Sequence, residues 1–162
     1  MAYIVAGTGC RSLATQSFQH KQDIAYSLHA TVRALQLEHH DLVLMSGMAE
    51  GWDEAIAWIA IHLHIPLIAA VPNRGYGAFY WGEHSYHNTD RLTKFLNYLK
   101  QAQEVVYVCE SIYENGLHAN FHRNQYMVDR ANEFLVYDPT SRGTSDCVRR
   151  INAAGKKWTE IK

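Results

Sequence analysis

The sequence has little of what marks a disulfide-stapled protein or one that coats nucleic acid. It contains three cysteines and three prolines in 162 residues, and its formal net charge is −1. Cys10, Cys109 and Cys147 are widely and irregularly spaced, which fits free thiols of a reducing cytosol better than a disulfide framework. The near-zero charge argues against broad binding to duplex DNA, which depends on neutralising phosphates, although a local basic patch stays open.

Long apolar runs are also missing, so no segment approaches the length of a membrane span. The chain enters the apolar segment Tyr3–Ala6 directly, without the basic and apolar regions of a secretion signal. We therefore expect a cytoplasmic protein with no membrane partner. The length and the 48% share of hydrophobic residues predict a single compact domain over residues 1–162.

What the sequence does contain is an alternation of strand and helix patterns. Strands are predicted at Tyr3–Ala6, Leu42–Met45, Leu67–Val71, Glu104–Cys109, Glu133–Tyr137 and Lys157–Glu160. Helices are predicted at Thr15–Glu38, Trp52–His62, Asn88–Gln101, His122–Arg130 and Thr144–Ala154. This alternation predicts an α/β fold with a mostly parallel sheet covered on both faces. Ligands of such sheets bind outside the carboxyl ends of the strands.

The first predicted strand is followed by Gly7, Thr8, Gly9, Cys10, Arg11 and Ser12. Gly7 and Gly9 would let the backbone turn sharply with its N–H groups exposed, and Arg11 adds a bidentate donor for phosphate or carboxylate. Ser12 stands where a dinucleotide fingerprint has its third glycine. A tight strand-to-helix turn with an incidental arginine is therefore an equally supported alternative.

A second small-residue turn, at Ser46, Gly47 and Asp53, follows the second predicted strand. Gly47 leaves space over the strand end, and the Asp53 carboxylate could accept hydrogen bonds from ribose hydroxyls. The alternative is that Asp53 merely complements the dipole of the helix that it begins.

A third turn follows the fifth predicted strand and carries Asp138, Arg142, Gly143, Thr144 and Ser145. The N–H groups at the start of a helix and an arginine suit an anion. The structural alternative assigns Asp138 to turn chemistry and Thr144 or Ser145 to a helix cap. In a parallel sheet all three turns open on one edge, so we expect their donors to line one cleft.

The segment Pro72–His87 mixes glycines with aromatic residues and has no regular pattern. It is predicted to be either a lid over the cleft or an aromatic plug of the core, with equal support for both. The histidine pairs His118/His122 and His84/His87 lack the thiolate or carboxylate partners of a zinc site, so no metal and no other cofactor is expected. His118 and His122 are expected to flank the pocket or cap the helix before Arg123.

The order of these motifs resembles the SLOG superfamily of Rossmann-like proteins, which includes DprA, the LOG enzymes and YpsA. The segment Ser46–Asp53 looks like the Ser-Gly-x-Ala-x-Gly-x-Asp signature of DprA and YpsA. The run Arg123–Asp129, followed by a strand and Gly143-Thr144, is similar to the YpsA pattern, as is the strand Glu104–Val108 with Tyr113 downstream. The resemblance covers nearly the whole chain and implies a Rossmann-like three-layer sandwich.

The resemblance also implies a pocket for a nucleotide or an ADP-ribose-like phosphorylated ligand, which is sensed or sequestered, with Arg123 and Asn124 reaching in from their helix. It implies a homo-oligomer as well. One alternative is a LOG-like hydrolase that cleaves the N-glycosidic bond of nucleoside monophosphates, with Arg123 and Asp146 as catalytic residues. Asp146 is one methylene shorter than the glutamate of LOG enzymes, and Arg142 replaces a glycine, which favours phosphate recognition over catalysis. Another alternative, less favoured, is DprA-like binding of single-stranded DNA.

Overall fold

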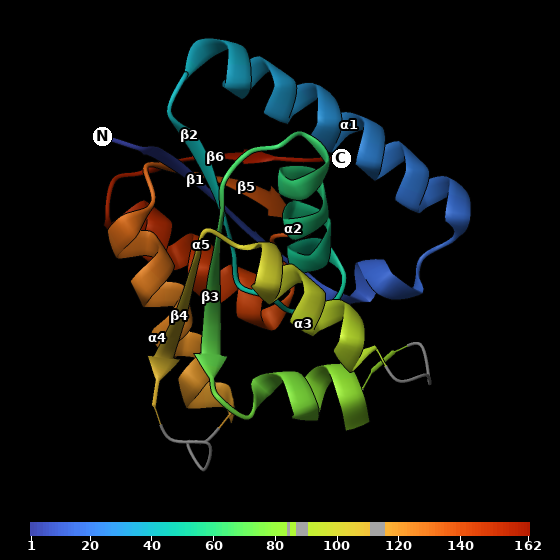
Figure 1. The fold of residues 1–162 in the computed structure, drawn as a ribbon. Coiled ribbons are helices and arrows are strands. Elements are labelled where there is room, and N and C mark those ends of the chain that lie inside the picture. The colour runs from blue at the N-terminus through green and yellow to red at the C-terminus, as the bar shows by residue number, and fades with distance from the viewer. Residues whose placement is uncertain (84, 87–90, 111–115) are drawn as a thin grey trace.

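Six parallel strands form one sheet in this computed structural model, which describes residues 1–83, 85–86, 91–110 and 116–162 (Figure 1). The strands are β1 Tyr3–Gly9, β2 Leu42–Ser46, β3 Leu67–Asn73, β4 Glu104–Cys109, β5 Glu133–Tyr137 and β6 Lys157–Glu160. The helices are α1 Phe18–Glu38, α2 Trp52–His62, α3 Leu92–Gln101, α4 Gly116–Arg130 and α5 Arg142–Ala153. A short 3-10 helix, η1 Arg11–Thr15, and a π-helical turn, η2 Gly77–Glu83, complete the described elements.

Each face of the sheet is covered by its own apolar core, because successive side chains of a strand point to opposite faces. Val5 and Leu44 pack with buried residues of α1, α2 and α3. Their neighbours Ile4 and Met45 pack with buried residues of α4 and α5 on the other face. Figure 1 shows these two helical layers with the sheet between them. The predicted three-layer α/β fold is confirmed.

The strand order is β4-β3-β2-β1-β5-β6, so the chain reverses direction across the sheet after β4. It builds outward from β1 through β4 and then returns to place β5 on the free side of β1, with Gly9 opposite Tyr137. The connections that leave β1 and β5 therefore diverge at their carboxyl ends. Such a topological switch point is where open parallel sheets bind their ligands.

Four helix starts differ from the sequence-based expectation, and α5 begins at Arg142 instead of Thr144. α1 begins at Phe18 because the Ser17 hydroxyl accepts the His20 N–H at 3.1 Å and caps the helix there. α4 begins at Gly116, so His122 lies inside the helix and exposed to solvent, and the expectation that it caps this helix is wrong. α3 begins at Leu92, because the described residue Arg91 is its non-helical cap; residues 88–90 of the predicted helix lie outside the described ranges.

None of the helices in the described part of the chain combines the length and the apolar character needed to span a bilayer.

Candidate functional site

A cavity of about 430 Å³ opens at the carboxyl ends of β1 and β5, at the switch point of the sheet. Its volume lies within the range of small-molecule sites, roughly 300–1,000 Å³. Nine of the residues predicted from the sequence line it: Thr8, Gly9, Arg11, Asp53, Arg123, Asn124, Arg142, Gly143 and Thr144. Seven lining residues were not predicted as site residues: Cys10, Ala49, Tyr76, Tyr86, Asn120, Phe121 and Ser141.

The structure places the other predicted site residues behind the cavity wall or beside it. Those that do not line the cavity are Gly7, Ser46, Gly47, Asp138, Ser145 and Asp146. Ser46 and Gly47 still shape the site. The Ser46 hydroxyl donates to the carbonyl oxygen of Asp53 at 2.7 Å and accepts the Met48 N–H at 3.1 Å, which fixes the turn between β2 and α2.

The sharp turn expected at Gly7 and Gly9 is instead the end of strand β1, while Thr8, Gly9 and Arg11 of this segment line the cavity. Both residues pair with β5, and the pairing continues as the Cys10 N–H donates to the Tyr137 carbonyl at 3.2 Å. A Cβ atom on Gly9 would lie 2.7 Å from the Cβ of Trp52. The glycines of β1 therefore allow α2 to approach the sheet closely.

Arg123 projects from α4 toward the turn after β2, and its guanidinium is held by three groups. It donates from Nη1 to the carbonyl oxygen of Gly47 and from Nε to Asn124 Oδ1 at 3.2 Å. It also lies 3.9 Å from the Asp53 carboxylate. A Cβ on Gly47 would lie 2.8 Å from the Arg123 guanidinium carbon, so the glycine makes room for the arginine. Arg123 of α4 thus contacts the turn that follows β2.

Asp53 lies in the first turn of α2 and is 5% exposed. Its Oδ2 accepts the Ala49 N–H at 3.2 Å. Burial raises the pKa of Asp53 to about 6, although Arg123, the Ala49 N–H and Arg11 each act to lower it. Among the described residues, Asp53 is the one acidic side chain that lines the cavity. It can therefore exchange a proton near neutral pH, which exceeds the helix-dipole role that the sequence also allowed.

The third turn presents the start of α5 to the cavity. Ser141 precedes the helix and donates from its hydroxyl to Thr144 Oγ1 at 2.7 Å. Because N–H groups in a first helical turn have no acceptor within the helix, they are available to an anion. Asp138 accepts the Thr140 hydroxyl at 2.6 Å and N–H at 3.3 Å. Asp138 therefore stabilises the turn, as the turn-chemistry alternative predicted, and it does not line the cavity.

Asp146, the catalytic candidate of the hydrolase alternative, is engaged by other side chains and does not line the cavity. Its carboxylate accepts from Arg149 at 2.6 Å, from Arg150 at 2.9 Å and from Asn124 Nδ2 at 3.2 Å. The same Asn124 amide donates to the Gly143 carbonyl at 3.2 Å. Asp146 and Asn124 thus join α5 to α4 and hold the start of α5 in place.

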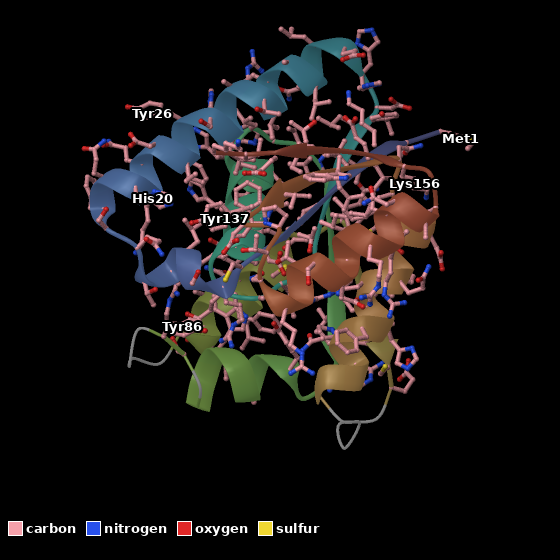
Figure 2. The ribbon with its side chains drawn as sticks, turned by 180° about the vertical axis from the view of Figure 1, so that it is seen from behind. Met1, His20, Tyr26, Tyr86, Tyr137 and Lys156 are labelled. Atoms are coloured by element: carbon pink, nitrogen blue, oxygen red, sulfur yellow. The ribbon has the colours of Figure 1, made fainter. Side chains whose placement is uncertain are left out.

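The described part of the aromatic segment 72–87 contributes both to the core and to the lining of the cavity. Trp81 is fully buried, donates from Nε1 to the Met48 carbonyl at 2.8 Å and packs on Phe95, so this part is a plug of the core. Tyr86 lines the cavity and is 49% exposed, with the Arg11 guanidinium 4.7 Å from its ring centroid. Figure 2 shows Tyr86 near the η1 segment that Arg11 begins. The side chains of Phe79 and Tyr80 and the residues His84 and His87 lie outside what the structure describes.

Charge in the cavity favours an anion. Arg11, Arg123 and Arg142 line it together with one described carboxylate, that of Asp53. Over the described ranges, no group of three or more histidine, cysteine, aspartate or glutamate side chains could hold a metal ion. The side chain of His118 and residue Tyr113 of the YpsA-like pattern are not among the described parts of the structure.

No family model matches the sequence, and a search of curated proteins finds no match either. Solved structures do match. DNA processing protein A (DprA) from Streptococcus pneumoniae aligns over 98% of this chain and 50% of its own, with 18% identity and a TM-score of 0.67. DprA from Helicobacter pylori aligns over 98% of this chain and 64% of its own, with 15% identity and a TM-score of 0.67. The structure of that protein was solved to show how it binds single-stranded DNA.

A third structure, the structural genomics target TM1055, aligns over 96% of this chain and 72% of its own, with 12% identity and a TM-score of 0.59. At these identities the likeness shows a shared fold alone. The chain spans about half to two thirds of the length of the DprA chains that it matches. The Rossmann-like fold implied by the resemblance to SLOG proteins is therefore supported by its structural neighbours.

Proposed function

We propose that the cavity binds a nucleotide or a nucleotide-derived phosphorylated ligand such as ADP-ribose, and that the protein senses or sequesters it. The observation that carries the proposal is the convergence of Arg11, Arg123 and Arg142 with the start of α5 on one cavity at the switch point. Arginine is a bidentate partner for phosphate, and a helix N-terminus adds N–H donors and a favourable dipole.

In this proposal a phosphate lies over the start of α5, where Gly143 leaves the backbone open and the Thr144 hydroxyl lines the cavity. Arg142 is exposed and approaches from the solvent side. Arg11 lines the cavity from the end of β1 and would meet a second phosphate or the far part of the ligand. Asp53, on the wall made by α2, is the candidate acceptor for ribose hydroxyls.

Thermal shift with inorganic phosphate, ribose 5-phosphate, AMP, ADP and ADP-ribose tests the proposal. A ligand at 100 times its dissociation constant adds about 2.7 kcal/mol to the free energy of unfolding. Arg142→Ala should weaken the shift without loss of stability, since the side chain is exposed. Arg149→Ala is the matched control, because this arginine lies on the same helix, is 74% exposed and does not line the cavity. A panel without any shift would contradict the proposal.

Hydrolysis of an N-glycosidic bond is a second candidate, favoured by the buried carboxyl of Asp53 beside Arg123. Water would add to the anomeric carbon, and the base would leave with a proton. Incubation of nucleoside monophosphates with the protein should then release free base, and Asp53→Asn should abolish the release while Asp146→Asn should not. Absence of free base with every substrate would leave the protein a binder.

Single-stranded DNA binding is the candidate that the structural likeness to the Helicobacter pylori protein favours. The net charge of −1 does not favour it, because the affinity of such proteins comes largely from a positive groove. Affinity for a labelled oligonucleotide at two salt concentrations separates the candidates. Tight binding that weakens steeply with salt would contradict the small-ligand proposal.

A further inference from the structure

We infer that Tyr86, backed by Arg11, forms a stacking subsite for the base of the ligand, so that the cavity selects nucleotides over sugar phosphates. The inference rests on the proposed function and adds to it the part of the ligand that is recognised. It assigns the anionic part of the ligand to the start of α5 and the aromatic part to the end of the cavity that Tyr86 lines.

Tyr86 differs from the other aromatic residues of segment 72–87 whose side chains are described. Tyr76 is 3% exposed and Trp81 is fully buried, so their rings are used by the core. Tyr86 is 49% exposed although it lines a cavity. About half of its surface is therefore open to solvent, and stacking on such a ring suits any base because every base has a π-face.

Arg11 gives this ring a fixed partner. Its guanidinium carbon lies 4.7 Å from the centroid of the Tyr86 ring, within the range of a cation–π contact. The same guanidinium lies 3.8 Å from the Glu50 carboxylate. Arg11 is thus held between a carboxylate and an aromatic face, where its charge also contributes to the positive potential of the cavity.

Glu50 holds the backbone on which Tyr86 is carried. This glutamate is fully buried and accepts from Arg91 Nη1 at 2.8 Å and from the Ser85 hydroxyl at 3.1 Å. Its other oxygen accepts the Tyr86 N–H at 3.4 Å. The segment that bears Tyr86 is therefore tied to the turn after β2, which also carries Asp53. A stacking platform fixed in this way loses little conformational freedom when a base binds.

Isothermal titration of AMP and ribose 5-phosphate against the wild type, Tyr86→Ala and Tyr86→Phe tests the inference. We expect the wild type to bind AMP at least about tenfold more tightly than ribose 5-phosphate, in line with stacking on one aromatic ring. Tyr86→Ala should lose about tenfold or more in affinity for AMP and should keep its affinity for ribose 5-phosphate. Tyr86→Phe keeps the ring and should retain the preference for AMP.

Tyr26→Ala is the matched control, because Tyr26 is 69% exposed on α1 and does not line this cavity. Its affinities for both probes should equal those of the wild type. If the wild type binds both probes equally, or if Tyr86→Ala keeps full affinity for AMP, the stacking subsite is overturned and the phosphate site stands. If the wild type binds neither AMP nor ribose 5-phosphate, the proposed function fails together with the inference.

Discussion

The Asp53 carboxylate lies 3.9 Å from the Arg123 guanidinium, and both side chains are buried in the wall of the cavity. They come from α2 and α4, which cover opposite faces of the sheet. The pair therefore bridges the two helical layers at the carboxyl edge. Burial outweighs the arginine in setting the proton affinity of Asp53, whose pKa is raised to about 6.

Asp53→Asn should change how stability depends on pH. Because the pKa of Asp53 is raised in the folded protein, the folded state binds more protons than the unfolded state between about pH 4 and 6, and stability falls as the pH rises through that window. The asparagine variant lacks this loss. Its free energy of unfolding relative to the wild type should therefore rise by on the order of 3 kcal/mol from pH 4 to pH 7.5.

Urea denaturation at several pH values measures this difference. Asp41→Asn, a change at an exposed aspartate, is the control and should show no comparable rise. A difference between Asp53→Asn and the wild type that stays flat over the window would contradict the assignment.

Arg123→Ala should lower the free energy of unfolding by about 3 kcal/mol, because it leaves the buried Asp53 carboxylate without its cation. It also removes the donor to the Gly47 carbonyl. The double variant with Asp53→Asn should recover part of the loss, and the double-mutant cycle gives the coupling between the two residues. Additive effects would show that the pair is not coupled in solution.

Gly9→Ala should lower the free energy of unfolding by about 2 kcal/mol or more, since the added Cβ would meet Trp52. Gly143→Ala is the matched control, because a Cβ there has no neighbour within 4 Å. Thermal unfolding of both variants measures the contrast. Equal stability would mean that α2 does not depend on the close approach that the glycine allows.

Glu50→Gln should lower the free energy of unfolding by about 3 kcal/mol, because Glu50 is fully buried and pairs with Arg91 at 2.8 Å. Glu110→Gln should change it by less than about 0.5 kcal/mol, because the Glu110 side chain is 79% exposed in its pair with Arg74. Guanidinium denaturation gives both values. A small effect at Glu50 would show that the segment bearing Tyr86 does not depend on this carboxylate.

Periodicity in the sequence was sufficient to predict the alternation of elements and the edge of the sheet at which the cavity lies. α2, β4, β5 and β6 have the predicted boundaries. β5 is buried along its whole length because both faces of the sheet are covered there, whereas β4 and β6 are edge strands that are half-buried and largely exposed, respectively. The start of α1 was predicted three residues too early, because the apolar pattern begins before Ser17 but the Ser17 hydroxyl caps the helix and fixes its first residue at Phe18.

Glycine was the residue whose meaning the sequence left most open. Gly9 and Gly143 both follow apolar segments, but Gly9 makes room for Trp52 while Gly143 leaves backbone open at a helix start. The two roles can be told apart only in the structure, where α2 packs over β1 at Gly9 and no neighbour lies close to Gly143. The sequence could not distinguish Tyr86 from Tyr76 either, because the burial of an aromatic ring depends on tertiary contacts that a local pattern does not contain.

The adjacency of β1 and β5 also sets the order in which the site can form. The two strands pair residue by residue, with Gly9 opposite Tyr137, yet more than a hundred residues separate them along the chain. During synthesis β1 emerges early and keeps an unpaired edge until β5 arrives, and the start of α5 arrives later still. A partly synthesised chain therefore contains Arg11 and Asp53 but lacks the wall that α5 contributes, so the cavity is complete only when the start of α5 is in place.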